Sequence, residues 1–475
     1  MQYFYKKSYA SGAGSLSLEE AGEHTNEQSI ASVAQSLGAR VLSVDPAEHT
    51  ILLELNDEEK TAIEETTGVE LFPNYQYSPA IFVDDVSLLS AATTPIDAAG
   101  PNKFSFVVEG TDGQKLVDAR VVVRLSPGVS ASALSGQDGE VNFSLRDPEI
   151  SDVQVYPKEN YWCASVAGGK ASESESVRKL LLEPLELPFK DSLGHFYPER
   201  EANVGAGVKV AIIDTGVNAH EDLPPISVQR TVLNGTVSDG CVDSSANHGT
   251  HVAGIVAGKR FGIAPGVTLL GYSVFPKDRP TAGTIDIATA IDHAVSDGAD
   301  IINLSLGMNK HDAVIAAAIA NAVDEGVFVV AATGNDGMAQ VSFPARLEDV
   351  YAVGAVGLRD AFAATSTHRL IGVREENEAK VYVANFSNFA HGKVDGAAPG
   401  VAVVSTVCTS GYQAKSGTSM ASPVVSAIAA GLLAKSPEVL SLTGRKRVEE
   451  LRELLYNGSQ KHDLNPQYVG VGVPS

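Results

Sequence analysis

The stretch VKVAIIDTGV (208–217) decides the fold, because an unbroken apolar run ends there in an aspartate and a glycine turn. A continuous run of this kind predicts a strand that is buried on both faces of a sheet. Similar runs alternate downstream with helix-like segments. The strand-like runs are TLLGYSV (268–274), IINLSL (301–306), VFVVAAT (327–333), VYAVGAV (350–356) and AAPGVAVVST (397–406). The helix-like segments are HVAGIVAG (251–258), TIDIATAIDHAVSDG (284–298), AVIAAAIANAVDEG (313–326) and SMASPVVSAIAAGLLAK (419–435). Residues 188–475 are therefore predicted to form an α/β domain, with a mostly parallel sheet covered by helices on both faces.

Residues 1–79 have a different texture, in which short strand-like and helix-like segments follow the order β-α-β-β-α-β. The segments are QYFYKK (2–7), NEQSIASVAQSL (26–37), VLSVD (41–45), TILLEL (50–55), DEEKTAIEETTG (57–68) and VELFP (69–73). Asn56 or Asp57 can cap the second helix, which is predicted to end at Gly68. This order predicts a small ferredoxin-like α+β domain.

Residues 80–187 contain four short runs of alternating polarity, separated by DG, SPG and QDG turns. The runs are FSFVVEG (104–110), ARVVVRL (119–125), EVNFSL (140–145) and DVQVYP (152–157). They predict a small antiparallel β-sandwich with linkers on both sides. Its role is left open between a binding surface and a spacer, since a fold does not imply a function.

Composition narrows the functional classes. The chain has 475 residues, is 44% hydrophobic and 20% charged, and carries a formal net charge of −23. That balance is globular, and it argues against a protein that binds nucleic acid or an anionic membrane unassisted. Cys163, Cys241 and Cys408 lie too far apart in the sequence to resemble a disulfide framework or a metal-binding motif.

The N-terminal sequence MQYFYKKSYASGAGS has no apolar segment followed by a cleavage site. No run of 18 or more apolar residues follows, so no membrane span is expected. These features predict a cytoplasmic protein, or one that is secreted without a standard signal peptide.

Three polar residues stand where chemistry is expected in such a fold. Asp214 directly follows a strand, His248 stands at the start of a helix in NHGTHVAGIVAG (247–258), and Ser419 opens the last long helix. Alone, each has an ordinary explanation, as a turn aspartate, a structural histidine or a helix-capping serine. His251 follows His248 at helical spacing, but a metal site would need a third ligand or an HExxH pattern, so a structural role is favoured.

Together the three residues supply what acyl transfer requires. Serine is a weak nucleophile that needs a positioned base, and the base needs an acid that orients it and stabilises its charged form. Asn335, in the turn AATGNDG (331–337), can donate a hydrogen bond to an oxyanion together with the backbone N–H of Ser419.

The motifs DTGV, HGTHVAG, SLG, ATGN and GTSMASP occur in the order that is found in one protein family. From about residue 188 to the last residue, the chain resembles the catalytic domain of subtilisin-like serine proteases (subtilases, peptidase family S8), whose triad runs Asp, His, Ser along the chain. The resemblance implies that Asp214 orients the base, His248 is the general base and then acid, Ser419 is the nucleophile and Asn335 is an oxyanion donor.

The resemblance also implies a substrate-binding edge. Leu304, Ser305, Leu306 and Gly307 would pair with an extended substrate by β-augmentation, and Ser342 and Phe343 would lie near the S1 pocket. Two features depart from the family pattern. Val424 stands where the family usually has histidine, and residues 358–384 form an insertion that is predicted to be a charged surface loop.

No cofactor is certain. No carboxylate cluster is strong enough to assign calcium, although the resemblance leaves calcium open.

The first stretch resembles the inhibitory propeptide of subtilases. That resemblance implies that residues 1–79 are an intramolecular inhibitor whose tail, FPNYQYSPA (72–80), runs through the substrate cleft. Tyr77 would then occupy the S1 pocket, with autocleavage near residues 77–80. The texture of residues 80–187 is closest to a prealbumin-like or carboxypeptidase-regulatory-like sandwich.

The expected function is that of a serine endopeptidase made as a zymogen, which acts on a protein or peptide substrate. The alternative is a zymogen-held or catalytically silent binding or scaffold protein on a subtilase fold.

Overall fold

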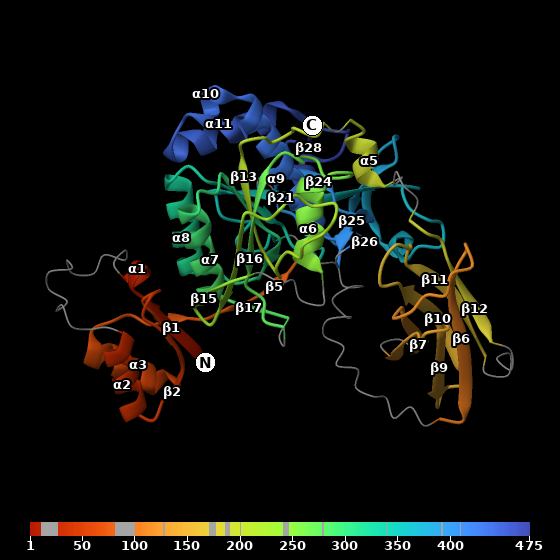
Figure 1. Ribbon diagram of the computed structural model, residues 1–475, viewed down its shortest axis with the longest axis horizontal. Coiled ribbons are helices and arrows are strands. Elements are labelled where there is room, and N and C mark those ends of the chain that lie inside the picture. The colour runs from red at the N-terminus through yellow and green to blue at the C-terminus, as the bar shows by residue number, and fades with distance from the viewer. Residues whose placement is uncertain are drawn as a thin grey trace.

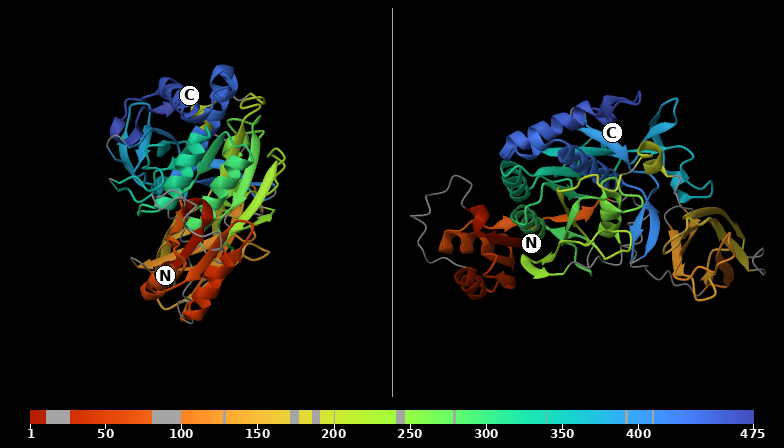
Figure 2. Two further views of the ribbon diagram at one scale, coloured as in Figure 1. Left: turned by 90° about the vertical axis from the view of Figure 1, so that its left-hand side faces the viewer. Right: turned by 45° about the horizontal axis from the view of Figure 1, so that its top comes forward.

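The computed structural model describes residues 1–10, 27–80, 100–126, 129–170, 177–185, 191–199, 201–240, 247–277, 280–338, 340–390, 393–408 and 410–475. Three units follow one another along the chain: an N-terminal unit (1–80), a middle unit (100–185) and a C-terminal unit (191–475). The N-terminal and middle units lie at opposite ends of the much larger C-terminal unit (Figures 1 and 2).

The N-terminal unit contains a four-stranded sheet in the order β2-β3-β1-β4. Its elements are β1 (Gln2–Lys6), α1 (Lys7–Ala10), α2 (Glu27–Ser36), β2 (Arg40–Asp45), β3 (Thr50–Glu54), α3 (Asp57–Thr67) and β4 (Phe72–Pro73). Helix α3 begins at a capping box, in which the Asn56 side chain accepts from the Glu59 N–H and the Glu59 carboxylate accepts from the Asn56 N–H. It ends at Gly68, whose φ of 69° is the left-handed conformation that glycine adopts without strain.

The middle unit contains two sheets, in the orders β11-β10-β7-β8 and β12-β6-β9. The strands are β6 (Asn102–Gly110), β7 (Arg120–Ser126), β8 (Val129–Leu134), β9 (Glu140–Leu145), β10 (Glu149–Tyr156), β11 (Ala164–Lys170) and β12 (Arg178–Leu182). Alternate residues of β6 are buried, and Phe104, Phe106 and Val108 join a core of their own that both sheets share. Period-two burial is what a strand with one face on a core shows.

The C-terminal unit is built on a ten-stranded sheet in the order β15-β14-β16-β13-β18-β20-β21-β23-β22, with β24 also paired to β21. Its strands in this sheet are β13 (Lys209–Asp214), β14 (Val228–Leu233), β15 (Thr236–Asp239), β16 (Thr268–Ser273), β18 (Ile301–Leu304), β20 (Phe328–Ala332), β21 (Val350–Leu358), β22 (Val373–Glu376), β23 (Val381–Ala384) and β24 (Gly396–Pro399). All pairings from β14 through β21, and that of β24, are parallel. The mostly parallel sheet that the sequence predicted for this part of the chain is therefore present.

Helices lie on both faces of this sheet (Figure 1). The helices of the described C-terminal unit are α5 (Ser192–Phe196), α6 (His248–Ala257), α7 (Thr284–Ser296), α8 (Ala313–Asp324), α9 (Thr418–Lys435), α10 (Pro437–Leu440), α11 (Gly444–Asn457), α12 (Pro466–Val469) and the short helix η2 (Thr367–Leu370). Helix α7 packs against α8, and both helices also contact strands of the sheet. Helix α9 packs against α6.

Short strands outside this sheet complete the C-terminal unit. They are β17 (Ala282–Gly283), β19 (Leu306–Gly307), β25 (Val403–Val407), β26 (Gly411–Lys415), β27 (Ser459–Gln460) and β28 (Val473–Pro474). Strand β5 (Gln76–Pro79) continues from the N-terminal unit and lies between β17 and β19. Figure 1 shows this orange strand reaching into the C-terminal unit.

The insertion 358–384 is not the surface loop that the sequence predicted. It forms β22 and β23 at the edge of the large sheet, with β23 antiparallel to β21. Its other part contacts the middle unit, because the carbonyl oxygen of Thr365 accepts from the Ser165 N–H at 2.8 Å. Charged residues made this segment look solvated, whereas VYVA (381–384) is a fully buried strand.

Among the described residues one helix, α9, is long and apolar enough to cross a membrane, so the expectation that no such stretch exists is not supported. This is weak evidence for a span, since 83% of its 18-residue window is buried inside the fold. A core helix passes the same test of length and composition.

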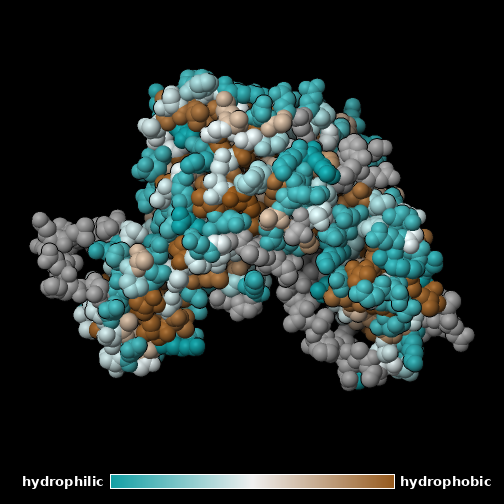
Figure 3. Space-filling model, in the orientation of Figure 1, coloured by the Kyte–Doolittle hydropathy of each residue, from teal (hydrophilic) through white to brown (hydrophobic). Residues whose placement is uncertain are grey.

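On the face drawn in Figure 3, hydrophilic residues cover most of the molecule, and hydrophobic residues gather in separate clusters. Cys163 is buried and Cys408 is partly buried, and neither forms a disulfide within the described residues, whereas Cys241 lies outside them.

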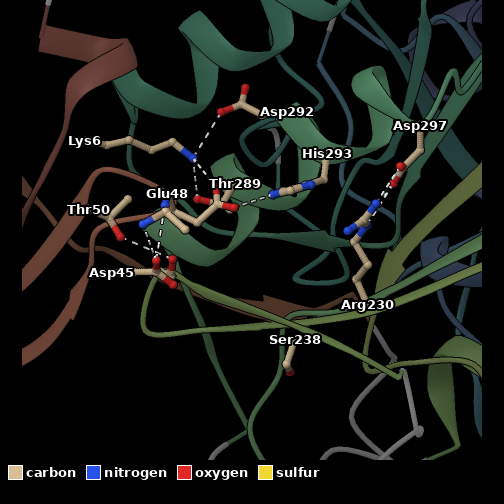
Figure 4. Close-up of polar contacts among 12 residues, drawn as sticks. Lys6, Asp45, Glu48, Thr50, Arg230, Ser238, Thr289, Asp292, His293 and Asp297 are labelled. Carbon is tan, nitrogen blue, oxygen red and sulfur yellow. Dashed lines mark hydrogen bonds and ion pairs between the residues drawn. The ribbon is translucent and has the colours of Figure 1, made fainter.

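The N-terminal unit docks on α7 through a cluster of charged and polar side chains, which Figure 4 draws. The ammonium of Lys6 is buried, donates to the Thr289 hydroxyl at 2.7 Å and lies 3.3 Å from an Asp292 carboxylate oxygen. In the same cluster, Glu48 Oε1 of the N-terminal unit lies 2.9 Å from Nε2 of His293, which belongs to α7. Apolar residues of the unit, including Phe4 and Leu52, also join the large core.

Candidate active site

Asp214 and His248 are brought together by the sheet and by α6. Asp214 is the last residue of β13, His248 is the first residue of α6, and His248 Nδ1 lies 2.6 Å from Asp214 Oδ1. Both side chains are buried. The approach depends on Gly249, where a Cβ atom would lie 2.1 Å from the carbonyl oxygen of Gly216. A histidine held this way by a buried carboxylate has its Nε2 directed away from that carboxylate.

Ser419 is the second residue of α9 and is fully buried. Its hydroxyl donates to the carbonyl oxygen of Ser305 at 3.0 Å. His248 Nε2 is buried and has no hydrogen-bond partner within the described part of the chain. The serine and the histidine thus do not share a hydrogen bond here, as is common before a reaction geometry tightens.

The backbone N–H of Ser419 and the amide of Asn335 converge on one carbonyl group. Ser419 N lies 3.2 Å from the carbonyl oxygen of Ala80, and Asn335 Nδ2 donates to the same oxygen. Asn335 Oδ1 accepts from both the N–H and the hydroxyl of Thr418, each at 2.9 Å, which orients the amide so that its NH2 faces Ala80. The N–H at the start of α9 and the side-chain amide of Asn335 are two donors suited to stabilise negative charge on that oxygen.

The residues before Ala80 lie in an extended groove between two strand edges. Tyr77 pairs with Ala282 of β17, and Pro79 pairs with Leu306 of β19, both antiparallel. The N–H of Ala80 donates to the carbonyl oxygen of Ser305 at 3.0 Å. The structure thus brings Ser305, Leu306 and Gly307 to the segment that ends at Ala80. Leu304 instead belongs to β18 of the large sheet.

The placement of Tyr77 differs from the sequence prediction. Ala80, not Tyr77, presents its carbonyl to Ser419 and Asn335. The Tyr77 ring enters a separate pocket, where its centroid lies 6.4 Å from that of Phe343. Phe343 therefore lies beside Tyr77, three residues before Ala80. Ser342 packs behind this turn, where its hydroxyl accepts from Asn388 Nδ2 at 3.2 Å.

His251 is a buried structural residue in this fold. Its Nε2 lies 3.1 Å from the carbonyl oxygen of Val403 and 3.0 Å from that of Gln413. Burial lowers the pKa of His251 well below its ordinary range, so the ring is neutral and its Nε2–H donates. Within the described ranges, no group of three or more metal-ligating side chains occurs. Val424 is buried in the body of α9.

Sequence reasoning missed Ala80, Asp312 and Thr284. The Tyr77 hydroxyl donates to Asp312 Oδ2 at 2.9 Å, and the Thr284 hydroxyl donates to the same oxygen at 2.7 Å. The position of Asp312 just before AVIAAAI is a helix-capping signal that could have drawn notice. Nothing local indicates that its second oxygen faces the cleft.

Comparisons with known proteins agree with this geometry. A model described as "Subtilase family" matches residues 205–472. The chain belongs to the subtilase family. It is 36% identical over 238 residues to Subtilisin BL of Lederbergia lenta, which covers 49% of this chain and 78% of that protein.

Two further relatives match as well. The chain is 35% identical to Alkaline elastase YaB of Bacillus sp. (strain YaB) over 264 residues, or 54% of this chain and 62% of the elastase. It is 37% identical to a Thermophilic serine proteinase of Bacillus sp. (strain AK1) over 277 residues, or 56% of this chain and 60% of that proteinase. The matches thus span about three fifths of these two relatives. A solved structure titled "S41 Psychrophilic Protease" superposes with a TM-score of 0.50 at 27% identity, over 60% of this chain and 98% of that one.

Proposed function

We propose that this subtilase is a serine endopeptidase that hydrolyses peptide bonds through an acyl-enzyme on Ser419. The observation that carries the proposal is the Ala80 carbonyl, which accepts from both the Ser419 N–H and the Asn335 amide. A peptide carbonyl held by two donors beside a serine hydroxyl is arranged for nucleophilic attack. Membership in the subtilase family supports the same reaction class.

In the proposed reaction Ser419 Oγ leaves its hydrogen bond to Ser305 and passes its proton to His248 Nε2 as it attacks the carbonyl carbon. Asp214, 2.6 Å from His248 Nδ1, holds the ring and stabilises the imidazolium that forms. Negative charge that develops on the carbonyl oxygen is stabilised by Ser419 N–H and Asn335. His248 then donates its proton to the leaving amine, and water hydrolyses the acyl-enzyme with His248 again as base.

We propose further that residues 1–80 are a prodomain that inhibits the enzyme within the same chain, and that the first bond cut follows Ala80. Strand β5 is held in the cleft by pairing on both edges, which supports occupation of the substrate site. In this assignment residues 1–80 form the prodomain, 81–187 the sandwich with its linkers, and 188–475 the catalytic domain. The sandwich would be a stable companion of the catalytic domain.

The test is incubation of the full chain beside its Ser419→Ala variant, with intact-mass analysis and labelling by a fluorophosphonate probe. The wild type is expected to split after Ala80 and to take up the probe, and the variant to do neither. A wild-type chain that stays whole and unlabelled, under conditions in which its N-terminal unit has been displaced by mild denaturant, would overturn the proposal.

A further inference from the structure

The Tyr77 pocket has a polar floor. The Tyr77 side chain is fully buried, and its hydroxyl reaches Asp312 Oδ2 at 2.9 Å. Asp312 is itself only 2% exposed. A buried tyrosine hydroxyl usually has a hydrogen-bond partner, and a buried carboxylate is costly without one.

The two oxygens of Asp312 have separate tasks. Oδ1 accepts from the N–H groups of Val314 and Ile315 at 3.0 and 3.3 Å, and so caps α8. Oδ2 accepts from Thr284 and Tyr77 and makes no contact with the backbone of α8. Within the described part of the chain no cation forms an ion pair with this carboxylate. If Tyr77 left, Oδ2 would keep the Thr284 hydroxyl alone.

The surroundings also fix which group donates. Burial, followed by the charge of Asp312 and the hydrogen bond to it, raises the pKa of Tyr77 far above its ordinary value, so the hydroxyl keeps its proton. The hydroxyl of Thr284 gives its own proton to Asp312 and accepts from the Tyr75 N–H at 2.9 Å. Both groups that donate to Asp312 Oδ2, the hydroxyls of Thr284 and Tyr77, are therefore neutral.

We propose that Asp312 is a specificity-determining residue, which makes the cleft select substrates with tyrosine three residues before the residue whose carbonyl is attacked. The inference rests on the proposed peptidase function, since it names the peptides that the same cleft accepts. Phenylalanine fills the same volume, but it would bury Oδ2 against a ring edge without a donor. A site that hydrogen-bonds a substrate hydroxyl strongly rejects an analogue that lacks this hydroxyl. An apolar pocket rejects an analogue with an added hydroxyl or methylene much less strongly.

The main experiment compares two peptides on the enzyme obtained from the full chain. Both carry the sequence of residues 74–80 (NYQYSPA) with a C-terminal p-nitroanilide, and they differ only by tyrosine or phenylalanine at the position of Tyr77. For wild type, kcat/KM is expected to favour tyrosine by about 10- to 100-fold. In Asp312→Ser, whose hydroxyl can still cap α8, the ratio is expected to fall to within about threefold of unity.

Asp191→Ser is the matched control, because Asp191 is also a buried capping aspartate, with Oδ1 on the Gly194 N–H and Oδ2 on the Val404 N–H. It should lower stability and leave the tyrosine preference unchanged. A wild-type enzyme that cuts both peptides equally, or an Asp312→Ser enzyme that keeps the full preference, would overturn the inference.

A second measurement separates this inference from the proposed function. In the full chain with Ser419→Ala, Tyr77→Phe and Asp312→Ser are combined in a double-mutant cycle, read by hydrogen exchange of the Ala80 amide, which is bonded to Ser305. Each single change is expected to speed exchange about 10-fold or more, and the double change no further. If the two substitutions speed exchange of the Ala80 amide by factors that multiply in the double variant, the Asp312 inference is overturned, even if the chain proves inactive. If the double variant exchanges no faster than the single variants, the inference is sustained even when no peptide is cut.

Discussion

The N-terminal and middle units both dock on the C-terminal unit, but they do so with different groups. The N-terminal unit uses titratable side chains, with Lys6 buried between Asp292 and Thr289, and extends a strand into the cleft. Around Asn160, the middle unit uses neutral side chains and backbone groups. The N–H of Asn160 donates to the carbonyl of Tyr412, and the Asn160 side chain accepts from the Tyr412 N–H.

The difference indicates how reversible each contact is. A buried charge cluster depends on every member, since removal of one charge leaves another uncompensated. Backbone hydrogen bonds between neutral groups contribute less each and respond little to pH. The N-terminal unit is therefore the one expected to detach after cleavage, and the middle unit the one expected to stay.

The largest effect is expected at the oxyanion donors. Asn335→Asp keeps the oxygen that accepts from Thr418 but replaces the NH2 donor by a second oxygen. It should slow the appearance of the 1–80 fragment by about 100- to 1000-fold, because developing charge on Ala80 loses a donor. Mass spectrometry over time measures this rate. Asn234→Asp, at an exposed turn, is the control, and an unchanged rate in Asn335→Asp would remove Asn335 from the proposed mechanism.

The next effect concerns the buried cation. Lys6→Met keeps the apolar stem and removes the ammonium from Asp292 and Thr289, which should weaken binding of the cleaved 1–80 fragment by about 2–3 kcal/mol. Titration calorimetry on the processed protein measures it. Lys60→Met is the control, since Lys60 pairs with Glu64 within the N-terminal unit, and should cost under about 0.5 kcal/mol. Equal losses for both variants would show that charge burial does not hold this unit.

The pH dependence sharpens the same contrast. Burial raises the pKa of Asp292, and nearby Lys6 offsets only part of that increase. A carboxyl whose pKa is raised on docking favours the docked state when protonated, so its contribution is full at low pH and is lost as pH rises through the raised pKa. The loss caused by Lys6→Met should therefore shrink by about 1 kcal/mol as pH falls from 7 to 4. Glu48 lies 3.8 Å from the Lys6 ammonium, and Tyr9 and His293 face the same cluster, so the difference between the two variants reports the pH response of the whole cluster around Lys6. A pH-independent difference would contradict the expectation.

The smallest effect is expected in the middle unit. Asn160 has a φ of 64°, which glycine adopts freely, so Asn160→Gly removes the side-chain acceptor of the Tyr412 N–H without backbone strain. The change should cost about 1 kcal/mol, seen as faster hydrogen exchange at the Tyr412 amide, with no pH dependence between 5 and 8. Asn234→Gly, also at positive φ, is the control. Release of the whole middle unit by this one change would break the contrast.

The sequence by itself determined the elements whose signals are local. Unbroken apolar runs such as VKVAIID predicted the parallel strands, because a strand buried on both faces has no polar side. The cap at Asn56 and the stop at Gly68 were equally local. Motif order placed Asp214, His248, Ser419 and Asn335 in one family pattern. The structure brings Asp214 to His248 and Asn335 to Ser419 around Ala80, while the catalytic roles of these residues stay predictions.

Only the tertiary structure decided which residue lies at the oxyanion donors. The register of 76–80 in the cleft is set by pairing with β17 and β19, more than 200 residues away in the sequence, and a shift by three residues leaves every local signal of the segment unchanged. The sequence also did not reveal the contact of the second oxygen of Asp312 or the strands of the insertion 358–384, because both depend on residues far away in the sequence. Capping explains only one oxygen of an aspartate, and a charged segment looks like a loop until the edge strand that it pairs with is in place.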